Sequence, residues 1–589
     1  MRTLWLSAIA VWLVAAGTVV AYDRIVVDAA LVDSSRTISG VVRVKFDAIE
    51  DRLTDLRFRL YPNKPCRGRD CGIEIDSLLV DGRDVSSAMV IDGTDMLVPL
   101  PDSTAGIREP AVAVWFRAII PEGVDRFGYY DDQYVLETWF PMPAPRGDGR
   151  WLRTDYTGEA EPVADFYDFE VHLSFPSTYV PIAPGIRAVD SSGAAHAVHV
   201  VLPSAHECSI VLGRNYVYRE SRVGEASVKV FYRARDAFAV DTLQETIRQT
   251  MEFMASEVLE YPYEEFVAVL GGFRGGGLET PRMILLPRPP IRTGTRFGHA
   301  LVIHEVVHQW FYGLLNSNQA DHPWLDESVT EYFTIRINKT LAGGRPSLLD
   351  MGGFSADYIL TERFSNDRYV RSVPINRPSS SYTRPDYYGT IYNKGSLVIK
   401  TLTGLMGAEN EREFWQEYAS RYSHTRVGPT DFYELADDYL PAMEGADARS
   451  IIGMTVPLDF EMMGFRSDRV TESDSAVADS AEVQERKYRN VITYAALHPI
   501  GTPVLLRLDF RDETTMDTVV NPLAGQNELT IMHASSVSGA VIDPEYVYAV
   551  DVNWLNNSLK PGAGKAGSVR LFSGATFLVE LLFGALWGW

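Results

Sequence analysis

The most informative stretch of this 589-residue sequence is HEVVHQWFYGLLNSNQADHPWLDE, at residues 304–327. It begins within an apolar segment, ALVIHEVVHQWF, which has no Pro or Gly and predicts a buried helix. His304 and His308 are four residues apart, so a helix places them on one face with their Cβ atoms about 6 Å apart. Both imidazoles can therefore converge on one metal ion, and Glu305 can reach the edge of the same site.

The pattern H-E-x-x-H on a helix is typical of zinc hydrolases, in which the two His bind the metal and the Glu is the general base. A catalytic zinc has three protein ligands and one open position. Glu327 in WLDE, separated from His308 by eighteen residues, is the predicted third ligand. Asp326 and Glu331 are neighbouring carboxylates, and Asp326 is a candidate to orient a ligand. The alternative is a chance H-E-x-x-H on a solvated helix, which the apolar character of this segment disfavours.

Length and composition indicate a folded protein of about three domains, with 46% apolar and 23% charged residues. The net charge of −23 excludes a general nucleic-acid binder, because nothing would offset the repulsion by phosphate. Cys66 and Cys71 flank a short turn-like loop, CRGRDC. They form either a local disulfide in an oxidising compartment or two free thiols.

Residues 1–21 are predicted to be an export signal. Arg2 precedes an apolar run, and Val19 and Ala21 occupy the −3 and −1 positions of a cleavage site before Tyr22. The alternative is an uncleaved membrane anchor, because the apolar run is long. In both cases we expect an exported protein, whether periplasmic, cell-surface or extracellular.

The pattern of apolar and polar residues divides the rest of the chain up to residue 560 into three segments. Residues 22–215 are short runs of alternating apolar and polar residues between turns, which predicts an all-β domain. Residues 216–455 mix strands with helical periodicity and contain the H-E-x-x-H segment. Residues 456–560 return to β texture, and the acidic, Ser/Ala-rich stretch 467–485 within them is predicted to be a solvated linker.

Residues 561–589 form an apolar tail with Glu580 in its middle. As a transmembrane helix the tail would be short, and Glu580 would cost about 2.5–3.5 kcal/mol at the centre of a bilayer. Lys565 and Arg570 would also lie on the exported side, against the positive-inside preference. An interfacial helix making peripheral membrane contact, or a helix docked on its own protein, fits the sequence better.

The sequence resembles the gluzincin aminopeptidases, the aminopeptidase N-type zinc metallopeptidases, in HEVVHQW, the eighteen-residue spacer and WLDE. LRFRLYPN with IEIDSLLVDG is similar to that family's N-terminal β domain, and EYPYEEFVAVL to the start of its catalytic domain. The resemblance implies a multidomain α+β protein: an N-terminal all-β domain, a thermolysin-like α+β catalytic domain and, here, a small C-terminal β-sandwich-like domain. It also implies one bound Zn²⁺.

The stretch GGGLET is similar to the family's Gly-x-Met-Glu-Asn loop, with Glu279 in the Glu position. The resemblance implies that this carboxylate pairs with the free α-ammonium of a peptide substrate, while Gly276 and Gly277 let the substrate backbone approach. The alternative is a hairpin turn with a solvated Glu279. Leu278 and Thr280 replace the Met and Asn of the motif, which puts strict exopeptidase behaviour in doubt.

The stretch YYGTIYNKG, at residues 387–395, is similar to the family's Tyr-x-Lys-Gly segment, and Tyr392 matches its catalytic Tyr. The resemblance implies that this hydroxyl donates a hydrogen bond to the oxyanion formed at the attacked carbonyl. Two departures stand out. Ser328 replaces the usual Gly, and β texture follows where many members have a helical domain over the site, so we expect a more open cleft.

The other nine of the eleven histidines lack partners at ligand spacing, and we expect them to be structural. His196 and His199 lie in strand-like sequence, where residues three apart point to opposite faces.

Taken with the resemblance, these residues predict an exported zinc aminopeptidase acting on peptides with a free N-terminus. The alternatives are a zinc hydrolase or peptidase that needs no free N-terminus, and a non-catalytic protein on the same scaffold. The intact HEVVH, Glu327 and Tyr392 speak against the last.

Overall fold

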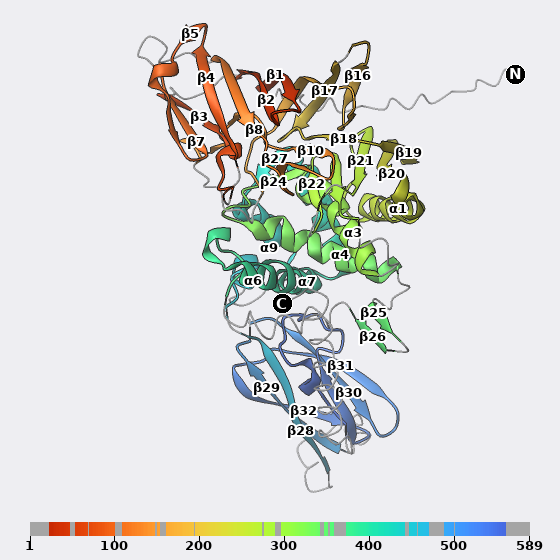
Figure 1. Ribbon diagram of the computed structural model, residues 1–589. Coiled ribbons are helices and arrows are strands. Elements are labelled where there is room, and N and C mark those ends of the chain that lie inside the picture. The colour runs from red at the N-terminus through yellow and green to blue at the C-terminus, as the bar shows by residue number, and fades with distance from the viewer. Residues whose placement is uncertain are drawn as a thin grey trace, which may run out of the picture.

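The protein is described from a computed structural model, in which β-rich N-terminal and C-terminal parts lie on either side of a helical middle part (Figure 1). The residues described are 23–46, 54–66, 68, 70–100, 109–147, 150–152, 161–193, 195–271, 273, 276–288, 296–341, 347–351, 354–357, 373–441, 447–455, 457–470, 488–499 and 501–560. The predicted export signal and the apolar tail lie outside these ranges.

The N-terminal part contains an eight-stranded sheet in the order β16-β17-β14-β1-β2-β8-β4-β5. All pairs are antiparallel except β1 with β14. The strands are β1 (Asp23–Val32), β2 (Thr37–Lys45), β4 (Gly72–Val80), β5 (Arg83–Asp84), β8 (Ala111–Ile119), β14 (Tyr167–Pro176), β16 (Ile186–Asp190) and β17 (Ala195–Ala205). Alternation along β1 buries Ile25 and Val27 and leaves Arg24 on the outer face, as period-2 patterning predicts.

Three smaller sheets complete the N-terminal part, in the orders β11-β3-β7-β6, β15-β18-β10-β9 and β12-β13. Their strands are β3 (Asp55–Arg59), β6 (Val90–Asp92), β7 (Asp95–Pro99), β9 (Phe127–Tyr130), β10 (Gln133–Leu136), β11 (Met142–Pro143), β12 (Arg146–Gly147), β13 (Arg150–Trp151), β15 (Val180–Ile182) and β18 (Ile210–Gly213). One apolar core joins the large sheet to the first two of these. Cys66 and Cys71 are joined by a disulfide, which decides between the two alternatives for this pair.

The middle part is built on a five-stranded sheet in the order β19-β20-β21-β23-β22. Its strands are β19 (Tyr216–Val223), β20 (Ala226–Arg233), β21 (Glu265–Leu270), β22 (Leu278–Thr280) and β23 (Met283–Leu286). The edge strand β22 pairs antiparallel with β23. Helices α1 (Val240–Glu257), α3 (Arg296–Phe311) and α4 (Glu327–Leu341) share one large core with this sheet, so α3 is a buried helix as the apolar pattern predicts.

Further helices and one π-helical turn follow α4, some of them packing on it and the rest on one another, and they support the region around Tyr392. They are α6 (Arg384–Tyr387), the π-helical turn η6 (Tyr388–Lys394), α7 (Gly395–Met406), α8 (Ala408–Tyr422), α9 (Pro429–Tyr439) and α10 (Ala448–Ile452). Two short strand pairs accompany them: β24 (Leu315–Ser317) with β27 (Thr425–Val427), and β25 (Ser347–Met351) with β26 (Phe354–Asp357). None of the helices that the structure describes is long and apolar enough to cross a membrane.

The C-terminal part is a sandwich of two sheets, β28-β29-β32 and β31-β30-β33-β34, around one core. The strands are β28 (Asp459–Arg469), β29 (Tyr488–Leu497), β30 (Val504–Phe510), β31 (Thr515–Val520), β32 (Gly525–His533), β33 (Val537–Ile542) and β34 (Ser558–Leu559). The predicted start of the acidic linker, residue 467, is wrong, because residues 467–469 belong to β28. These polar residues form a strand because they pair with β29, as Asp468 does with Arg489. Their composition alone does not reveal this pairing. Residues 471–487 lie outside the described part of the chain.

Candidate active site

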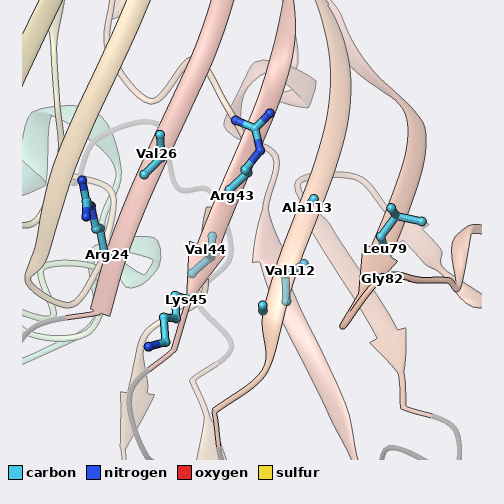
Figure 2. A pocket seen from close by; sticks show the side chains of 10 residues that line it. Arg24, Val26, Arg43, Val44, Lys45, Leu79, Gly82, Val112 and Ala113 are labelled. Atoms are coloured by element: carbon cyan, nitrogen blue, oxygen red, sulfur yellow. The ribbon is translucent and has the colours of Figure 1, made fainter.

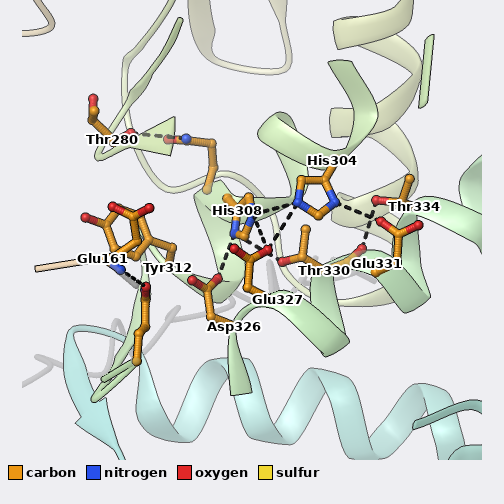
Figure 3. Close-up of polar contacts among 12 residues, drawn as sticks. Glu161, Thr280, His304, His308, Tyr312, Asp326, Glu327, Thr330, Glu331 and Thr334 are labelled. Carbon is orange, nitrogen blue, oxygen red and sulfur yellow. Dashed lines mark hydrogen bonds and ion pairs between the residues drawn. The ribbon is translucent and has the colours of Figure 1, made fainter. Parts of the chain in front are cut away.

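Helix α3 and the start of α4 bring His304, His308 and Glu327 together (Figure 3). The Nε2 atoms of the two histidines are 3.0 Å apart, and Glu327 Oε2 lies 3.3 Å from that of His304 and 3.4 Å from that of His308. Donor atoms about 2.0–2.1 Å from a tetrahedral zinc ion lie roughly 3.3–3.4 Å from one another. The three side chains therefore have the spacing and the donor types of a zinc site.

The turn that precedes α4 fixes where Glu327 lies. Trp324, in the 3₁₀ turn η4 (Pro323–Leu325), is fully buried, and its ring stacks on Tyr433 with centroids 5.9 Å apart. The helix then begins at Glu327, where the partial positive charge of a helix N-terminus favours a carboxylate. Anchoring the turn by a buried aromatic residue thus places the third candidate ligand opposite α3.

The outer nitrogen atoms of both imidazoles contact carboxylates. Glu331 Oε2 lies 3.0 Å from His304 Nδ1, and Asp326 Oδ1 lies 2.7 Å from His308 Nδ1 (Figure 3). Thr330 Oγ1 is also 3.3 Å from His308 Nδ1. Such contacts fix the tautomer and direct Nε2 of each ring to the shared site. Sequence reasoning gave Asp326 this role, whereas it assigned none to Glu331.

Glu327 Oε2 is buried and accepts no hydrogen bond within the described structure, although it faces both imidazoles. Burial by itself raises the pKa of Glu327, but His304 and His308 more than offset this and lower it well below its ordinary value. The carboxylate is therefore ionised. A buried anionic oxygen without a hydrogen bond is costly unless a cation occupies the space before it.

Glu305 and Glu279 lie beside this cluster, and both are buried. Burial and the nearby Glu279 carboxylate raise the pKa of Glu305 to about 8, although His304 and His308 oppose the shift. Glu279, on edge strand β22, offers an oxygen within 4.8 Å of ligand atoms of His308 and Asp326. Two carboxylates, one on α3 and one on β22, thus border the three candidate ligands.

Tyr392, in the π-helical turn η6, also borders the cluster. Its hydroxyl donates a hydrogen bond to Glu327 Oε1, and its ring lies 5.8 Å from that of His304. Ser328 Oγ donates to the carbonyl of Ile391 over 2.6 Å and fills the space where a Cβ on Gly395 would lie. The Ser at this unusual position therefore ties α4 to the turn that carries Tyr392. π-helical turns occur frequently at functional sites.

Sequence reasoning missed a buried group of ionisable side chains next to Glu279. Arg126 Nη1 donates to Glu137 Oε1 over 2.9 Å and also pairs with Glu161. Burial raises the pKa of Glu137 and raises that of Glu207 well above its ordinary value. These residues come from separate segments of the N-terminal part, so no local spacing connects them. Glu137 lies in the aromatic and Pro-rich stretch LETWFPMPAPRGDGRW, at residues 136–151, whose composition does not point to Arg126 or Glu207.

Residues 238–451 match the family profile described as the peptidase family M1 domain. This part of the chain is therefore similar to the peptidase family M1 domain. Over 227 residues the chain is 27% identical to leucine aminopeptidase 2 of Pyricularia oryzae, covering 37% of this chain and 35% of that protein. It is also 27% identical over 214 residues to aminopeptidase B of Rattus norvegicus, covering 34% and 32%. The chain spans about a third of the length of the curated relatives it matches.

Two solved structures share the fold of this chain. Aminopeptidase A of Legionella pneumophila, in complex with aspartic acid, superposes with a TM-score of 0.65 at 12% identity, covering 90% of this chain and 59% of that one. A mutant M1 zinc metallopeptidase of Deinococcus radiodurans gives 0.52 at 16% identity, covering 74% and 95%. With the family match, these findings confirm the resemblance to the gluzincin aminopeptidases and the multidomain α+β fold class.

Proposed function

We propose that this protein is a zinc aminopeptidase of the M1 family that acts after export. The observation that carries the proposal is the cluster of His304, His308 and Glu327, whose three donor atoms lie 3.0–3.4 Å apart. Glu305 and Glu279 are buried beside that cluster. The relatives that the chain resembles, a leucine aminopeptidase and an aminopeptidase B, are consistent with the proposal.

The donor set fits zinc rather than a hard cation. Two imidazoles and one carboxylate suit Zn²⁺, whereas Ca²⁺ and Mg²⁺ take all-oxygen sites. The buried Glu327 Oε2, which accepts no hydrogen bond in the part of the chain described, is the group that a cation would neutralise. When bound, zinc supplies a Lewis acid that acidifies a water molecule and polarises a carbonyl group. His304, His308 and Glu327 would hold it.

Glu305 is the group placed to move protons. Its Oε2 is buried and has no hydrogen-bond partner among the described residues, so it is free to accept a proton from an attacking water. The same carboxyl group then gives that proton to the leaving amine. The nearby cationic charge of a filled metal site would lower the pKa of Glu305 from about 8, which keeps it in the basic form.

Tyr392 is the donor for the oxyanion. Its hydroxyl donates to Glu327 Oε1, so it already lies at the edge of the metal cluster. Burial raises the pKa of Tyr392 well above its ordinary value, which keeps the phenol protonated and able to donate. A donor held at the position where negative charge develops stabilises the transition state.

Glu279 is the group that would select a free N-terminus. It is buried, and its Oε1 has no hydrogen-bond partner in the described ranges. A buried carboxylate is stabilised by an ammonium group at hydrogen-bond distance. The α-ammonium of a peptide, bound at this end, would bring the first peptide bond towards Glu305. This geometry favours removal of N-terminal residues.

The test compares an aminoacyl anilide with its N-acetylated form, in wild type and in Glu279→Gln. We expect wild type to cleave only the anilide with the free α-amine. Glu279→Gln should lose most of the preference for this substrate over the acetylated form, because its KM for the free-amine anilide rises. Equal cleavage of both forms by wild type would favour the hydrolase that needs no free N-terminus. No cleavage of either form by the zinc-loaded chain would favour the non-catalytic alternative.

Export is supported by two features: the signal-like residues 1–21 and the Cys66–Cys71 disulfide, a bond that persists in oxidising compartments. We expect N-terminal sequencing of the mature protein to begin at Tyr22. Peripheral membrane contact through residues 561–589 stays a prediction from the sequence. Recovery of the intact exported protein entirely in the soluble fraction would contradict it.

A further inference from the structure

A second cluster of metal-binding side chains lies on the outer face of the eight-stranded sheet. Strand β14 contributes Glu170 and His172, and strand β17 contributes His199. The ladder between the strands makes His172 and His199 direct cross-strand partners. One ligand atom from each of the three residues lies within 4.8 Å of the others. The proposed peptidase site uses none of these residues.

The distances suit a tetrahedral ion. Glu170 Oε1 lies 3.2 Å from His199 Nε2 and 3.7 Å from His172 Nε2. The imidazole rings are stacked, with centroids 4.5 Å apart and an interplanar angle of 16°. Donor atoms around tetrahedral zinc are roughly 3.3–3.4 Å apart, so small side-chain rotations complete the site. The paired strands hold the three residues without any change of backbone.

Neighbouring side chains leave the relevant donor atoms available. Asp28 Oδ1 lies 3.1 Å from His172 Nδ1, so Nε2 of that ring is the atom directed towards Glu170. A carboxylate–histidine hydrogen bond orients the ligand in zinc sites, and a small rotation of Asp28 or His172 would form it, because Nδ1 makes no hydrogen bond in the present geometry. Arg24 pairs with Oε2 of Glu170, whereas both imidazoles face its Oε1. The two carboxylate oxygens of Glu170 thus face different groups: Oε2 faces Arg24, and Oε1 faces the two imidazoles.

The local charge indicates which ions would bind. Arg24 and Arg43, which extend from β1 and β2 on the outer face of the sheet (Figure 2), pair with Glu170 and Asp28. The two carboxylates are therefore balanced by two guanidinium groups, and a site of this kind gives little attraction to Ca²⁺ or Mg²⁺. Imidazole donors instead favour borderline transition ions such as Zn²⁺.

We propose that Glu170, His172 and His199 form a second site for a divalent transition ion of the zinc class. Their side chains are 22%, 44% and 33% exposed, so the ion has direct access from solvent and a water molecule can take the fourth position. The bound ion cross-links β14 to β17 and stabilises the N-terminal part. Sequence spacing does not reveal the site, because the two histidines meet across strands and not along one.

The test counts the zinc ions bound by the full-length chain dialysed against excess Zn²⁺. We expect two ions for wild type, and one for His172→Ala and for His199→Ala. His196→Ala, a matched control on β17 that packs on Phe175, should bind two. Asp28→Asn should weaken binding of the second ion by about 10–100-fold. A single ion in wild type, or two ions in His199→Ala, would overturn the proposal.

A second measurement separates this site from the proposed peptidase site. In His304→Ala/His308→Ala, which lacks the two candidate imidazole ligands of that site, added Zn²⁺ should still raise Tm, and His199→Ala in the same background should remove the shift. Turnover of the otherwise unmodified His199→Ala chain should equal that of wild type. An unchanged Tm shift after His199→Ala would contradict the assignment, whatever the outcome for peptidase activity.

Discussion

Gly277 lies directly against the carboxylate of Glu305. A Cβ atom on Gly277 would overlap the Cδ and Oε1 atoms of that side chain. The sequence resemblance explains glycine at this position by the approach of a substrate backbone. The structure adds a reason within the protein, because the carboxylate of the candidate general base occupies the space that a side chain at Gly277 would need.

Gly277→Ala should therefore displace Glu305. We expect kcat to fall by about 10²-fold, since a displacement of about 1 Å in a catalytic group has effects of that size, while zinc content stays unchanged. Steady-state kinetics with metal analysis measures both. Gly464→Ala is the matched control, because no atom lies within 4 Å of the position of its Cβ. Full activity in Gly277→Ala would show that this contact does not position the carboxylate.

Tyr392→Phe removes the hydroxyl that donates to Glu327 Oε1. We expect kcat to fall by roughly 10²–10³-fold with little change in KM, because an oxyanion donor acts in the transition state. Tyr388→Phe is a suitable control, since its ring stacks on Tyr392 at a centroid distance of 5.2 Å. Loss in KM alone for Tyr392→Phe would instead indicate a role in substrate binding.

Some residues of the candidate site can be predicted from the sequence, and others cannot. The H-E-x-x-H pair is set by one helical turn, so spacing alone places His304 and His308 on one face. Glu327 was predicted from its spacing and from the family resemblance, and the structure brings it to both imidazoles. Glu137 follows β10 and Glu207 lies between β17 and β18, so the two meet only through the tertiary fold. No pattern in the sequence connects them to Glu279.

Asp326→Asn tests the contact with His308, whose Nδ1 lies 2.7 Å from Asp326 Oδ1. We expect zinc affinity to fall by about 10–100-fold, because an amide orients the ring less strongly than a carboxylate does. Competition with a chelator measures the change. Asp321→Asn, at an exposed position five residues earlier, should have wild-type affinity. Equal affinities in the two variants would mean that Asp326 is only structural.

In the fold, as in the candidate site, the features predicted from the sequence are those set by local patterns, and the missed features depend on long-range pairing. The β texture of residues 22–215 corresponds to strands, because period-2 alternation is a local signal. The polar end of β28 was missed, since its pairing with β29 depends on a segment that follows the acidic stretch. Likewise His172 and His199 looked isolated along the chain, although they are cross-strand neighbours.

His206 should make the protein sensitive to acid. Its ring is buried, and burial lowers its pKa to about 3, with partial compensation from the carbonyl of Tyr312, which lies 3.0 Å from Nε2. The folded pKa is below the unfolded value, so this stability is present above about pH 6.5 and is lost as pH falls towards 3. At about pH 5 the loss is roughly 2 kcal/mol.

Urea unfolding of wild type and His206→Gln at about pH 7 and pH 5 measures this contribution. We expect the difference between the two pH values to be smaller in the variant by up to about 2 kcal/mol. His498→Gln, at an exposed position, should behave like wild type. An identical pH dependence in His206→Gln and wild type would contradict the assignment of acid sensitivity to this residue.

The central claim, that Glu305 transfers protons beside a zinc ion held by His304, His308 and Glu327, is tested most directly by Glu305→Gln. The amide keeps the shape of the side chain but cannot accept the proton. We predict a variant that is folded and retains one zinc ion in this site, with kcat on an aminoacyl anilide reduced by at least about 10²–10⁴-fold. Near-normal turnover by zinc-loaded Glu305→Gln would contradict the account.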